Sequence, residues 1–426
     1  MNLSNVNIAV VGLGYVGLPL ACMFAKKYNV VGYDTKEERI KNINKAIDDN
    51  DEIPSSILQR AINRGFFASS NIEDIKQYNF YIITVPTPVD ENNKVDLRCL
   101  LSATKTVAQI LKKNDIVVYE STVYPGMTEE ECVPLIERIS HLEYNKDFFV
   151  GYSPERINPG DSIHSVETIK KVTSGSTPEI ADFIDDVYNS VLENGTFKAS
   201  CIKVAEAAKI IENTQRDVNI AFMNELAKIF NAMGIDTKEV IEAASSKWNF
   251  IKLYPGLVGG HCISVDPYYL IQKAEVYGLR PRLLMNAREL NDAMGTYVAN
   301  QVIKQMNKKG IVIKDSKILI LGFTFKENCS DIRNTKVKDI YSVLKEYTDD
   351  ITVFDPHANK EKVLNEYNIN ITNTAPKEKG YDCVVIAVAH KEFHGLNPRS
   401  FLKDANKGIV YDVKGLFDKQ LIDYRL

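Results

Sequence analysis

The chain has 426 residues, too many for one compact core, so we expect two or three domains. Its hydrophobic content of 45% and charged content of 25% are those of an ordinary globular protein and exclude a disordered or fibrous one. The net charge is −4, with Lys and Arg spread along the chain, which argues against a nucleic-acid partner.

Neither a membrane span nor a signal peptide is predicted. The longest apolar run, residues 383–389, is strand-sized and far shorter than the roughly 20 residues of a membrane helix. The first residues lack a basic segment followed by an apolar one. We therefore expect a cytoplasmic protein with no membrane partner.

The N-terminal part of the chain alternates strand and helix patterns. Residues 7–11 predict a strand, residues 15–27 a helix and residues 30–33 a second strand. Further strands are predicted at 80–85, 116–119, 148–152 and 170–173. Strands that alternate with helices indicate βαβ units and a parallel sheet.

The pattern changes from about residue 200. Residues 203–233 carry apolar side chains at helical spacing without Pro or Gly, which predicts one unusually long helix. A second helix is predicted over 283–305. Long mid-chain helices often join domains and form dimer interfaces, so we expect a homodimer or a higher homo-oligomer, although such a face can also be buried within one subunit.

The α/β pattern then returns, with strands predicted at 317–322, 351–355, 383–388 and 409–412 and a helix at 337–347. The predicted fold is therefore α/β, with two Rossmann-like, doubly wound parallel-sheet domains joined by a central long helix. We place the domains at 1–199, 200–306 and 307–426. Ligands should lie at the carboxyl ends of the strands.

A glycine motif, GLGYVG at residues 12–17, stands between the first strand and the first helix. Its spacing alone is weak evidence, but this context is the one in which such a loop binds a dinucleotide pyrophosphate. Asp34 ends the second strand, where a carboxylate accepts ribose hydroxyls and repels a 2′-phosphate, so NAD is favoured over NADP. Arg39 is the opposing signal, since an arginine can pair with a 2′-phosphate. The alternative is a doubly wound fold that binds no dinucleotide.

One of the seven cysteines stands in an unusual context. Because no CxxC pair occurs, neither a disulfide framework nor a zinc site is predicted. Cys262 follows a glycine-rich loop and precedes a helix for which Asp266 is a suitable N-cap. A thiol near a helix start ionises more readily, and the thiolate is the nucleophile. The alternative is a buried structural cysteine in a glycine-rich turn.

Polar residues on the long helix form a second candidate group. Glu206, Lys209 and Asn213 share one helix face by their spacing. Such residues usually form a solvated face, but Lys209 stands among alanines, where a partly buried ammonium can stabilise an oxyanion. His261 adjoins Cys262, yet adjacent loop side chains usually diverge, so it is not expected to act as its base. No histidine has metal-ligand spacing, and no metal is expected.

Five motifs occur in an order that resembles the UDP-glucose/GDP-mannose dehydrogenase family. They are residues 12–19 (GLGYVGLP), 152–161 (YSPERINPGD), 206–214 (EAAKIIENT), 259–266 (GGHCISVD) and 322–333 (GFTFKENCSDIR). The resemblance implies a four-electron oxidation of a nucleotide-sugar alcohol by two NAD molecules in sequence. Cys262 would form a thiohemiacetal with the intermediate aldehyde, then a thioester, and hydrolysis would release a uronate.

The resemblance also implies three sets of site residues. The catalytic set is Cys262, Lys209, Asn213, Asp266, Glu155 and Thr122. The cofactor-binding set is Gly12, Gly14, Tyr15, Val16, Gly17, Asp34, Arg39, Pro86, Thr87, Ser121, Thr122 and Arg333. The substrate-binding set is Glu155, Arg156, Lys209, Asn213, Lys252, Tyr254, Gly259, Phe325 and Lys326. Within these sets, the lysine and asparagine of the long helix would hold the oxyanion and a water, and Thr122 and Glu155 would serve hydrolysis.

Within the family, residues 247–262 (KWNFIKLYPGLVGGHC) resemble the branch that acts on UDP-N-acetylhexosamines. The UDP-glucose branch usually carries Ser or Tyr before the cysteine and Lys before the aspartate, whereas this chain has His261 and Val265. The resemblance does not separate GlcNAc from GalNAc, and UDP-glucose and UDP-ManNAc stay as alternatives. Residues 412–415 are a further candidate contact to the substrate.

Two other functions fit parts of the sequence. A two-electron β-hydroxyacid dehydrogenase shares the first Rossmann half and the long helix, but it would need no cysteine. An NAD-binding sensor or scaffold would rarely keep a nucleophile, a lysine, an asparagine and a carboxylate together. The leading prediction is therefore a UDP-sugar 6-dehydrogenase that supplies uronic acids for a surface polysaccharide.

Overall fold

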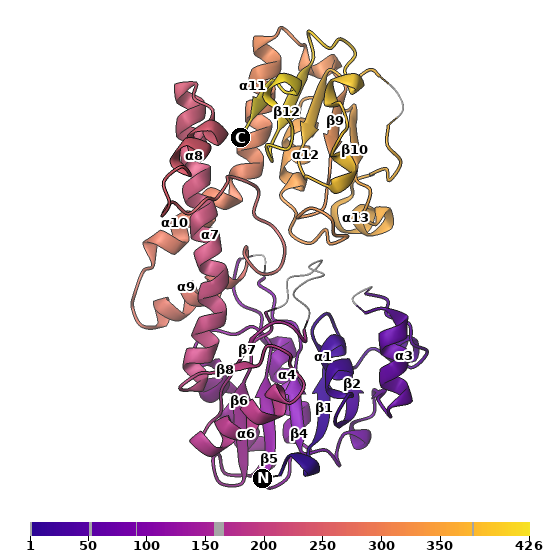
Figure 1. The fold of residues 1–426 in the computed structure, drawn as a ribbon, viewed down its shortest axis with the longest axis vertical. Coiled ribbons are helices and arrows are strands. Elements are labelled where there is room, and N and C mark those ends of the chain that lie inside the picture. The colour runs from indigo at the N-terminus through magenta and orange to yellow at the C-terminus, as the bar shows by residue number, and fades with distance from the viewer. Residues whose placement is uncertain (1, 51–52, 91, 157–165, 377–378) are drawn as a thin grey trace. The chain divides into compact units, whose positions relative to one another are not determined.

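The computed structural model describes residues 2–50, 53–90, 92–156, 166–376 and 379–426 (Figure 1). The chain forms two compact units, one of residues 1–212 and 268–279 and the other of residues 213–267 and 280–426. No helix in the described part of the chain has the length and apolar character needed to cross a membrane.

The first unit contains a six-stranded parallel sheet with the strand order β3-β2-β1-β4-β5-β6. Its strands are β1 (Asn7–Val11), β2 (Asn29–Tyr33), β3 (Phe67–Ser69), β4 (Phe80–Ile83), β5 (Asp115–Tyr119) and β6 (Phe148–Tyr152). This order is that of a dinucleotide-binding doubly wound sheet. The predicted strands over 7–11, 30–33, 80–85, 116–119 and 148–152 are confirmed, each to within two residues.

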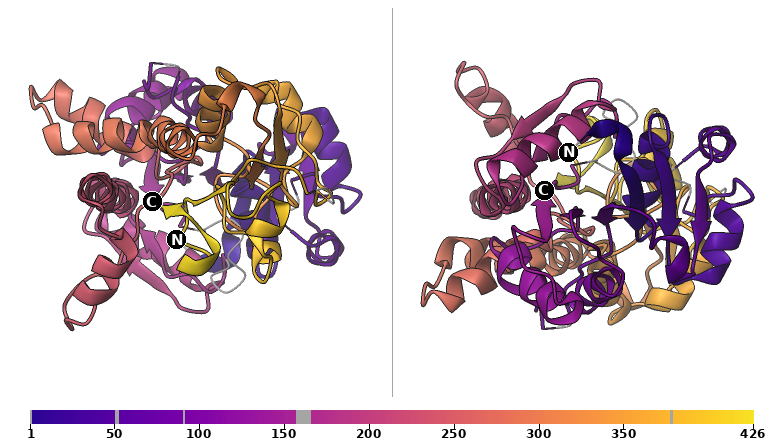
Figure 2. Two further views of the ribbon diagram at one scale, coloured as in Figure 1. Left: turned by 90° about the horizontal axis from the view of Figure 1, so that it is seen from above. Right: turned by 90° about the horizontal axis from the view of Figure 1, so that it is seen from below.

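Helices cover both faces of this sheet (Figures 1 and 2). Ile8 and Val10 of β1 pack in one hydrophobic cluster and Ala9 and Val11 in another, because successive strand side chains point to opposite faces. The first cluster includes α1 (Gly17–Phe24), α2 (Glu37–Ile43), α3 (Ser55–Asn63) and α6 (Pro178–Asn189). The second includes α4 (Arg98–Ala108) and α5 (Val133–Ser140). A two-stranded sheet of β7 (Lys171–Thr173) and β8 (Thr196–Lys198) adjoins them.

The predicted long helix is confirmed as α7 (Ile202–Met233), whose 32 residues span about 48 Å at 1.5 Å per residue (Figure 1). It is followed by α8 (Thr237–Ala244) and α9 (Asp266–Val276). The single helix predicted over 283–305 is wrong, because α10 (Arg282–Asp292) and α11 (Met294–Lys308) are separate helices that meet at Ala293. A Cβ on Gly295 would lie 2.8 Å from the carbonyl oxygen of Lys336, so the start of α11 packs tightly against the backbone at Lys336.

The second unit contains a five-stranded parallel sheet with the order β10-β9-β11-β12-β13. Its strands are β9 (Ile318–Leu321), β10 (Ile351–Phe354), β11 (Cys383–Ile386), β12 (Ile409–Asp412) and β13 (Tyr424–Arg425). Helices α11, α12 (Val337–Lys345) and α13 (Lys360–Tyr367) pack on one face, and 3-10 turns and loops pack on the other. Two parallel sheets and a long helix between them in sequence confirm the predicted fold class.

Candidate functional site

The glycine loop after β1 has the shape that a dinucleotide pyrophosphate requires. Gly12 has φ +96, a region that favours glycine, and a Cβ on Gly17 would lie 1.8 Å from the carbonyl oxygen of Gly12. A Cβ on Gly14 would meet nothing within 4 Å, so the backbone there is open to a ligand. Helix α1 starts at Gly17, two residues later than predicted, because Tyr15 and Val16 belong to this turn. The loop therefore fits NAD.

Two charged residues that follow β2 in the sequence, Asp34 and Arg39, form hydrogen bonds with the same loop. The carboxylate of Asp34 accepts a hydrogen bond from Leu13 N at 2.9 Å and another from Lys36 N at 3.0 Å. The guanidinium of Arg39 donates to Leu13 O at 3.0 Å and pairs with Asp48 at 2.6 Å and with Asp49. Two carboxylates already neutralise the guanidinium of Arg39, and the residue is 6% exposed. Arg39 therefore supports the loop and attracts a 2′-phosphate only weakly.

The loops after β4 and β5 are tied to each other at the carboxyl ends of their strands. Thr87 donates to the carbonyl of Thr122 at 2.7 Å, and Ser121 donates to that of Val85 at 2.6 Å. The hydroxyl of Tyr269 in α9 donates to the carbonyl of Thr87. Thr87 and Ser121 are buried, whereas Pro86 is exposed. These predicted cofactor residues lie on one edge of the first sheet, as expected for a ligand site in such folds.

Glu155 follows β6 and contacts a buried lysine that the sequence analysis missed. Lys171 Nζ lies 3.3 Å from Glu155 Oε2 and 2.6 Å from Glu120 Oε2. Arg156 N donates to Glu155 at 2.5 Å, while its guanidinium pairs with Glu212 at 2.6 Å. The only sequence signal for this cluster was charged residues at strand ends, which is common in sheets. The rest of the predicted motif, residues 157–161, lies outside the described residues.

On α7, Glu206 and Lys209 have different surroundings. Glu206 is fully buried, and its carboxylate accepts hydrogen bonds from Gly126 N at 2.5 Å and Thr128 N at 2.9 Å. Burial raises the pKa of Glu206 to about 7 in spite of these bonds. Glu206 therefore holds the loop after β5. Lys209 is 8% exposed, which agrees with the expected partly buried ammonium.

The Cys262 loop lies in the second unit, directly before α9. Cys262 is exposed, and its carbonyl accepts hydrogen bonds from Asp266 N at 2.8 Å and Val265 N at 3.1 Å. Helix α9 begins at Asp266, so this residue is not the N-cap that the sequence predicted. Residues 260–265 form turns that lead directly into the helix. Its carboxylate instead accepts a hydrogen bond from Asn213 Nδ2 at 2.5 Å. The exposed thiol excludes the alternative of a buried structural cysteine.

Both ends of the glycine stretch before Cys262 are fixed by hydrogen bonds. Gly256 exchanges two hydrogen bonds with the side chain of Asn224, at 2.8 and 3.0 Å. Gly260 N donates to Arg333 O at 3.2 Å, and Asn334 Nδ2 donates to Gly260 O at 3.1 Å. Gly260 has φ +79, and a Cβ there would lie 2.7 Å from the ring of Phe325. The loop is thus held in one conformation.

Several predicted substrate residues surround small cavities at the carboxyl ends of the second sheet. Phe325 and Lys326 follow β9 and line one of them together with Lys414. A second cavity of about 260 Å³ is lined by Tyr254, Lys414 and Arg425, among others. Lys252 Nζ lies 5.7 Å from the centre of the Tyr254 ring. Lysines and an aromatic ring are suited to a nucleoside diphosphate. Gly259 is buried against the carbonyl of Asn334.

Arg333 pairs with Asp331 through Nε at 2.8 Å and through a second nitrogen at 2.6 Å. The guanidinium is half-buried. Its predicted contact with the cofactor phosphates stays a prediction.

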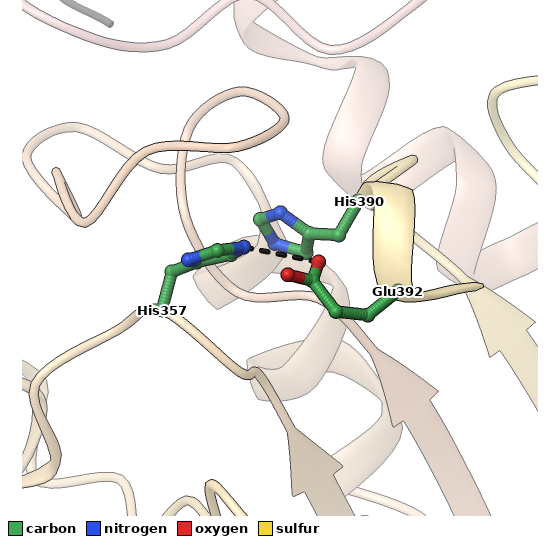
Figure 3. A group of neighbouring side chains, drawn as sticks. All are labelled: His357, His390 and Glu392. Atoms are coloured by element: carbon green, nitrogen blue, oxygen red, sulfur yellow. Dashed lines mark hydrogen bonds and ion pairs between the residues drawn. The ribbon is translucent and has the colours of Figure 1, made fainter. Parts of the chain in front are cut away.

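Among the described residues, His357, His390 and Glu392 form a group whose ligand atoms lie within 4.8 Å of one another (Figure 3). His390 Nδ1 accepts a hydrogen bond from Asn328 N at 3.0 Å, so its Nε2 carries the proton that it donates to Asp355 at 3.0 Å. Both ring nitrogens are thereby engaged, and the donor set does not fit a metal ion. The hydrogen bond between His390 and Asp355 instead connects the chain that follows β11 to the chain that follows β10.

These features define a class of protein, a dinucleotide-dependent oxidoreductase with an exposed cysteine in a fixed loop. Comparisons with known proteins narrow that class. The NAD binding domain of the UDP-glucose/GDP-mannose dehydrogenase family matches residues 6–192, its central domain residues 203–293 and its UDP binding domain residues 319–419. The chain belongs to this family and is an NAD-dependent UDP-sugar dehydrogenase.

Relatives resemble the chain over its whole length. A UDP-N-acetyl-D-glucosamine 6-dehydrogenase from Pseudomonas aeruginosa is 51% identical, covering 100% of both chains, and one from Salmonella typhi is 52% identical, covering 100% of this chain and 99% of the relative. The solved structure of a UDP-D-ManNAc dehydrogenase from Pyrococcus horikoshii has a TM-score of 0.87 at 30% identity, covering 99% of this chain and 98% of that chain.

Proposed function

We propose that this protein oxidises the C6 hydroxyl of a UDP-N-acetylhexosamine to a carboxylate, with Cys262 as the covalent nucleophile. The observation that carries the proposal is the exposed thiol of Cys262 in a fixed loop, four residues before a carboxylate that is bound by Asn213. This arrangement resembles the thiol, amide and carboxylate set expected for a thioester route. A two-electron β-hydroxyacid dehydrogenase has no use for it.

Two hydride transfers and one hydrolysis balance the reaction. When bound in the glycine loop after β1, NAD would supply the hydride acceptor, one molecule for the oxidation of the alcohol carbon and a second for that of the thiohemiacetal carbon. Between these transfers the Cys262 thiolate adds to the aldehyde carbon, and Lys209 and Asn213 stabilise the oxygen that becomes negative. Water then attacks the thioester, the C–S bond breaks and the thiolate leaves. The alcohol, one water and two NAD⁺ give the carboxylate, two NADH and three protons.

We assign the water-handling groups to the first unit. Glu155 accepts a proton from the attacking water, and Thr122 orients that water. The cofactor-binding set named above holds NAD, with Arg39 acting through Leu13. The substrate-binding set, including Lys326, Phe325, Lys252 and Tyr254, holds the nucleotide and the sugar. The matches of the three family domains support the division into domains 1–199, 200–306 and 307–426.

The sugar we favour is N-acetylglucosamine, because two relatives at 51% and 52% identity are named for it. UDP-GalNAc, UDP-glucose and UDP-ManNAc are the alternatives, and a relative named for the mannosamine sugar is 32% identical. We place the reaction in the cytoplasm, where NAD and nucleotide sugars are made, and assign its product to a surface polysaccharide.

We also infer that two copies of the chain associate through α7. Apolar side chains at helical spacing stay 46–63% exposed along it, namely Val204, Ile211, Phe222, Ile229 and Met233. Their separations of 7, 11, 7 and 4 residues each complete nearly whole helical turns, which places them in a single stripe opposite the buried face. An exposed apolar stripe of this length marks an interaction surface.

A direct assay tests the proposed function. NADH formation is measured with UDP-GlcNAc, UDP-GalNAc, UDP-ManNAc and UDP-glucose for the wild type, Cys262→Ser and Cys99→Ser. Cys99 is an exposed cysteine on α4 and serves as the matched control. We expect two NADH per sugar with an N-acetylated donor, an unchanged control and loss of the full yield in Cys262→Ser. Absence of NADH with all four donors, or full yield in Cys262→Ser, would contradict the proposal.

A further inference from the structure

A buried cluster of charges lies behind Glu155 in the first unit. Lys171 at the start of β7 is fully buried, Glu120 after β5 is 2% exposed and Glu155 is 9% exposed. The ammonium of Lys171 lies 2.6 Å from Glu120 and 3.3 Å from Glu155. The hydroxyl of Tyr188 in α6 donates to the other oxygen of Glu120 at 2.5 Å. Lys171 thus bridges two carboxylates that have little contact with water.

The charge balance of this buried cluster depends on the ammonium of Lys171. An ammonium without water is strongly destabilised unless it is paired, and two carboxylates without a cation cannot both stay charged. Burial lowers the pKa of Lys171, but Glu120 and Glu155 outweigh this effect and the pKa is raised overall. Burial raises the pKa of Glu120 to about 7, against the opposing effect of Lys171. Burial therefore favours the protonated form of Glu120.

Among the described residues, the other charged groups near Glu155 have partners of their own or carry no positive charge. Arg156 is next in the chain, but its guanidinium pairs with Glu212 of α7 at 2.6 Å and donates to the carbonyl of Lys170 at 2.7 Å. Neither Glu120 nor Tyr188 can supply a positive charge. Glu120 is a carboxyl group, and the phenol of Tyr188 is neutral because burial raises its pKa well above the ordinary value.

We propose that Lys171 is a positioning residue for the reaction: anchored by Glu120 and Tyr188, its ammonium orients the carboxylate of Glu155 as a proton acceptor. The proposal rests on the proposed function, in which Glu155 accepts a proton from the water that attacks the thioester. We assign Lys171 no contact with the substrate or the cofactor; it acts through Glu155.

The proposal predicts which step of the reaction slows when Lys171 is replaced by an uncharged residue. In Lys171→Met the carboxylate of Glu155 loses the cation that lies 3.3 Å from it. We expect the acid limb of the kcat profile to move to higher pH by about one unit, so that kcat at a pH on that limb falls about tenfold. Hydrolysis slows while thioester formation continues. Enzyme with the sugar bound covalently at Cys262 therefore accumulates and is detected by mass spectrometry after acid quenching.

Four further variants separate this effect from damage to the fold. Lys171→Arg restores the charge, so its acid limb returns toward that of the wild type. Glu120→Gln removes a negative charge, so its acid limb lies at or below that of the wild type and never above it. Lys198→Met, on β8, breaks an exposed ion pair with Asp182 of α6 and leaves the profile unchanged. Lys171→Gln replaces the methionine variant if the latter does not fold.

The outcomes decide between the two proposals. A shifted limb and an accumulated adduct in Lys171→Met, with rescue by arginine, support the positioning role. An unshifted limb without adduct in Lys171→Met, or any upward shift in Glu120→Gln, overturns it while the proposed function stands. A wild type that forms no NADH with any UDP-sugar overturns the proposed function itself.

Discussion

The side-chain amide of Asn213 donates a 2.5 Å hydrogen bond to the carboxylate of Asp266, joining α7 to the first residue of α9. Asn213 is 6% exposed and Asp266 is 2% exposed, so this bond forms almost without competition from water. Cys262 lies one turn before Asp266 and is held to it by a backbone hydrogen bond of 2.8 Å. The position of the thiol therefore depends on a contact between two helices.

Replacement of Asn213 by Ala removes this contact. We expect a loss of stability of about 1.5–3 kcal/mol, because a buried hydrogen bond to a charged group is lost. We also expect kcat to fall by a factor of roughly 10²–10³ if Asn213 stabilises the oxyanion. Calorimetry and steady-state assays measure the two effects. Asn231→Ala is the control on the same helix, since its amide lies 3.5 Å from Tyr297 Oη, a marginal hydrogen bond. Equal kcat values for both variants would contradict the assigned role.

Replacement of Asp34 by Ala tests the choice of cofactor. The variant loses the hydrogen bond to Leu13 N and the expected contacts to the ribose hydroxyls, so KM for NAD should rise on the order of tenfold. KM for NADP should rise less, because the repulsion of a 2′-phosphate disappears. Initial rates with each cofactor give the ratio. A wild type that prefers NADP would contradict the assignment.

Gly260→Ala tests whether the cysteine loop needs its close approach to Phe325. Both the left-handed backbone and a Cβ 2.7 Å from the ring oppose the substitution, and we expect a loss of stability of about 2–4 kcal/mol together with low activity. Gly310→Ala is the control, with φ +72 and nothing within 4 Å of a Cβ. The difference in Tm between the variants measures the clash alone. Equal losses would show that only backbone strain matters.

The buried carboxyl group of Glu206 predicts a pH dependence of stability. Its pKa is about 7 when folded and close to 4.5 when unfolded, so the folded protein binds the proton more tightly. This contribution is fully present below pH 4.5 and is lost as pH rises through 7, by up to roughly 3 kcal/mol. Glu206→Gln cannot ionise. Its Tm should therefore fall less than that of the wild type between about pH 5 and pH 8. Parallel Tm curves would contradict the prediction.

The apolar stripe on α7 predicts the effect of surface charges on association. Phe222→Asp and Ile229→Asp each place a carboxylate in the inferred interface, so the mass in solution should shift from a dimer toward the 48.0 kDa monomer. Arg216→Asp, at an exposed position of α7 outside the stripe, should leave the dimer intact. Light scattering over a dilution series measures the masses. A wild type that is monomeric at every concentration would contradict the inference.

Local chemistry determined much of this protein from its sequence alone. The spacing of Gly12, Gly14 and Gly17 predicted a pyrophosphate loop, because only glycine tolerates the φ of +96 and the 1.8 Å approach found there. The unbroken apolar period of residues 203–233 predicted α7 to within one residue. The loop glycines before Cys262 and the carboxylate after it marked this cysteine as a candidate nucleophile, with a buried structural cysteine as the alternative. Each of these signals is carried by neighbours in the chain.

Contacts between distant segments were decided only by the tertiary structure. Lys171 and Glu120 stand 51 positions apart, and nothing near either residue distinguishes a buried ion pair from two ordinary surface charges. Arg39 reads from sequence as a ligand for a phosphate, but folding brings it to Asp48 and Leu13 and makes it a support. Asp266 reads as a helix cap, but α7 supplies Asn213 to its carboxylate. Periodicity and turn chemistry report the local backbone, whereas the partner of a buried charge depends on which segments the sheets and helices bring together.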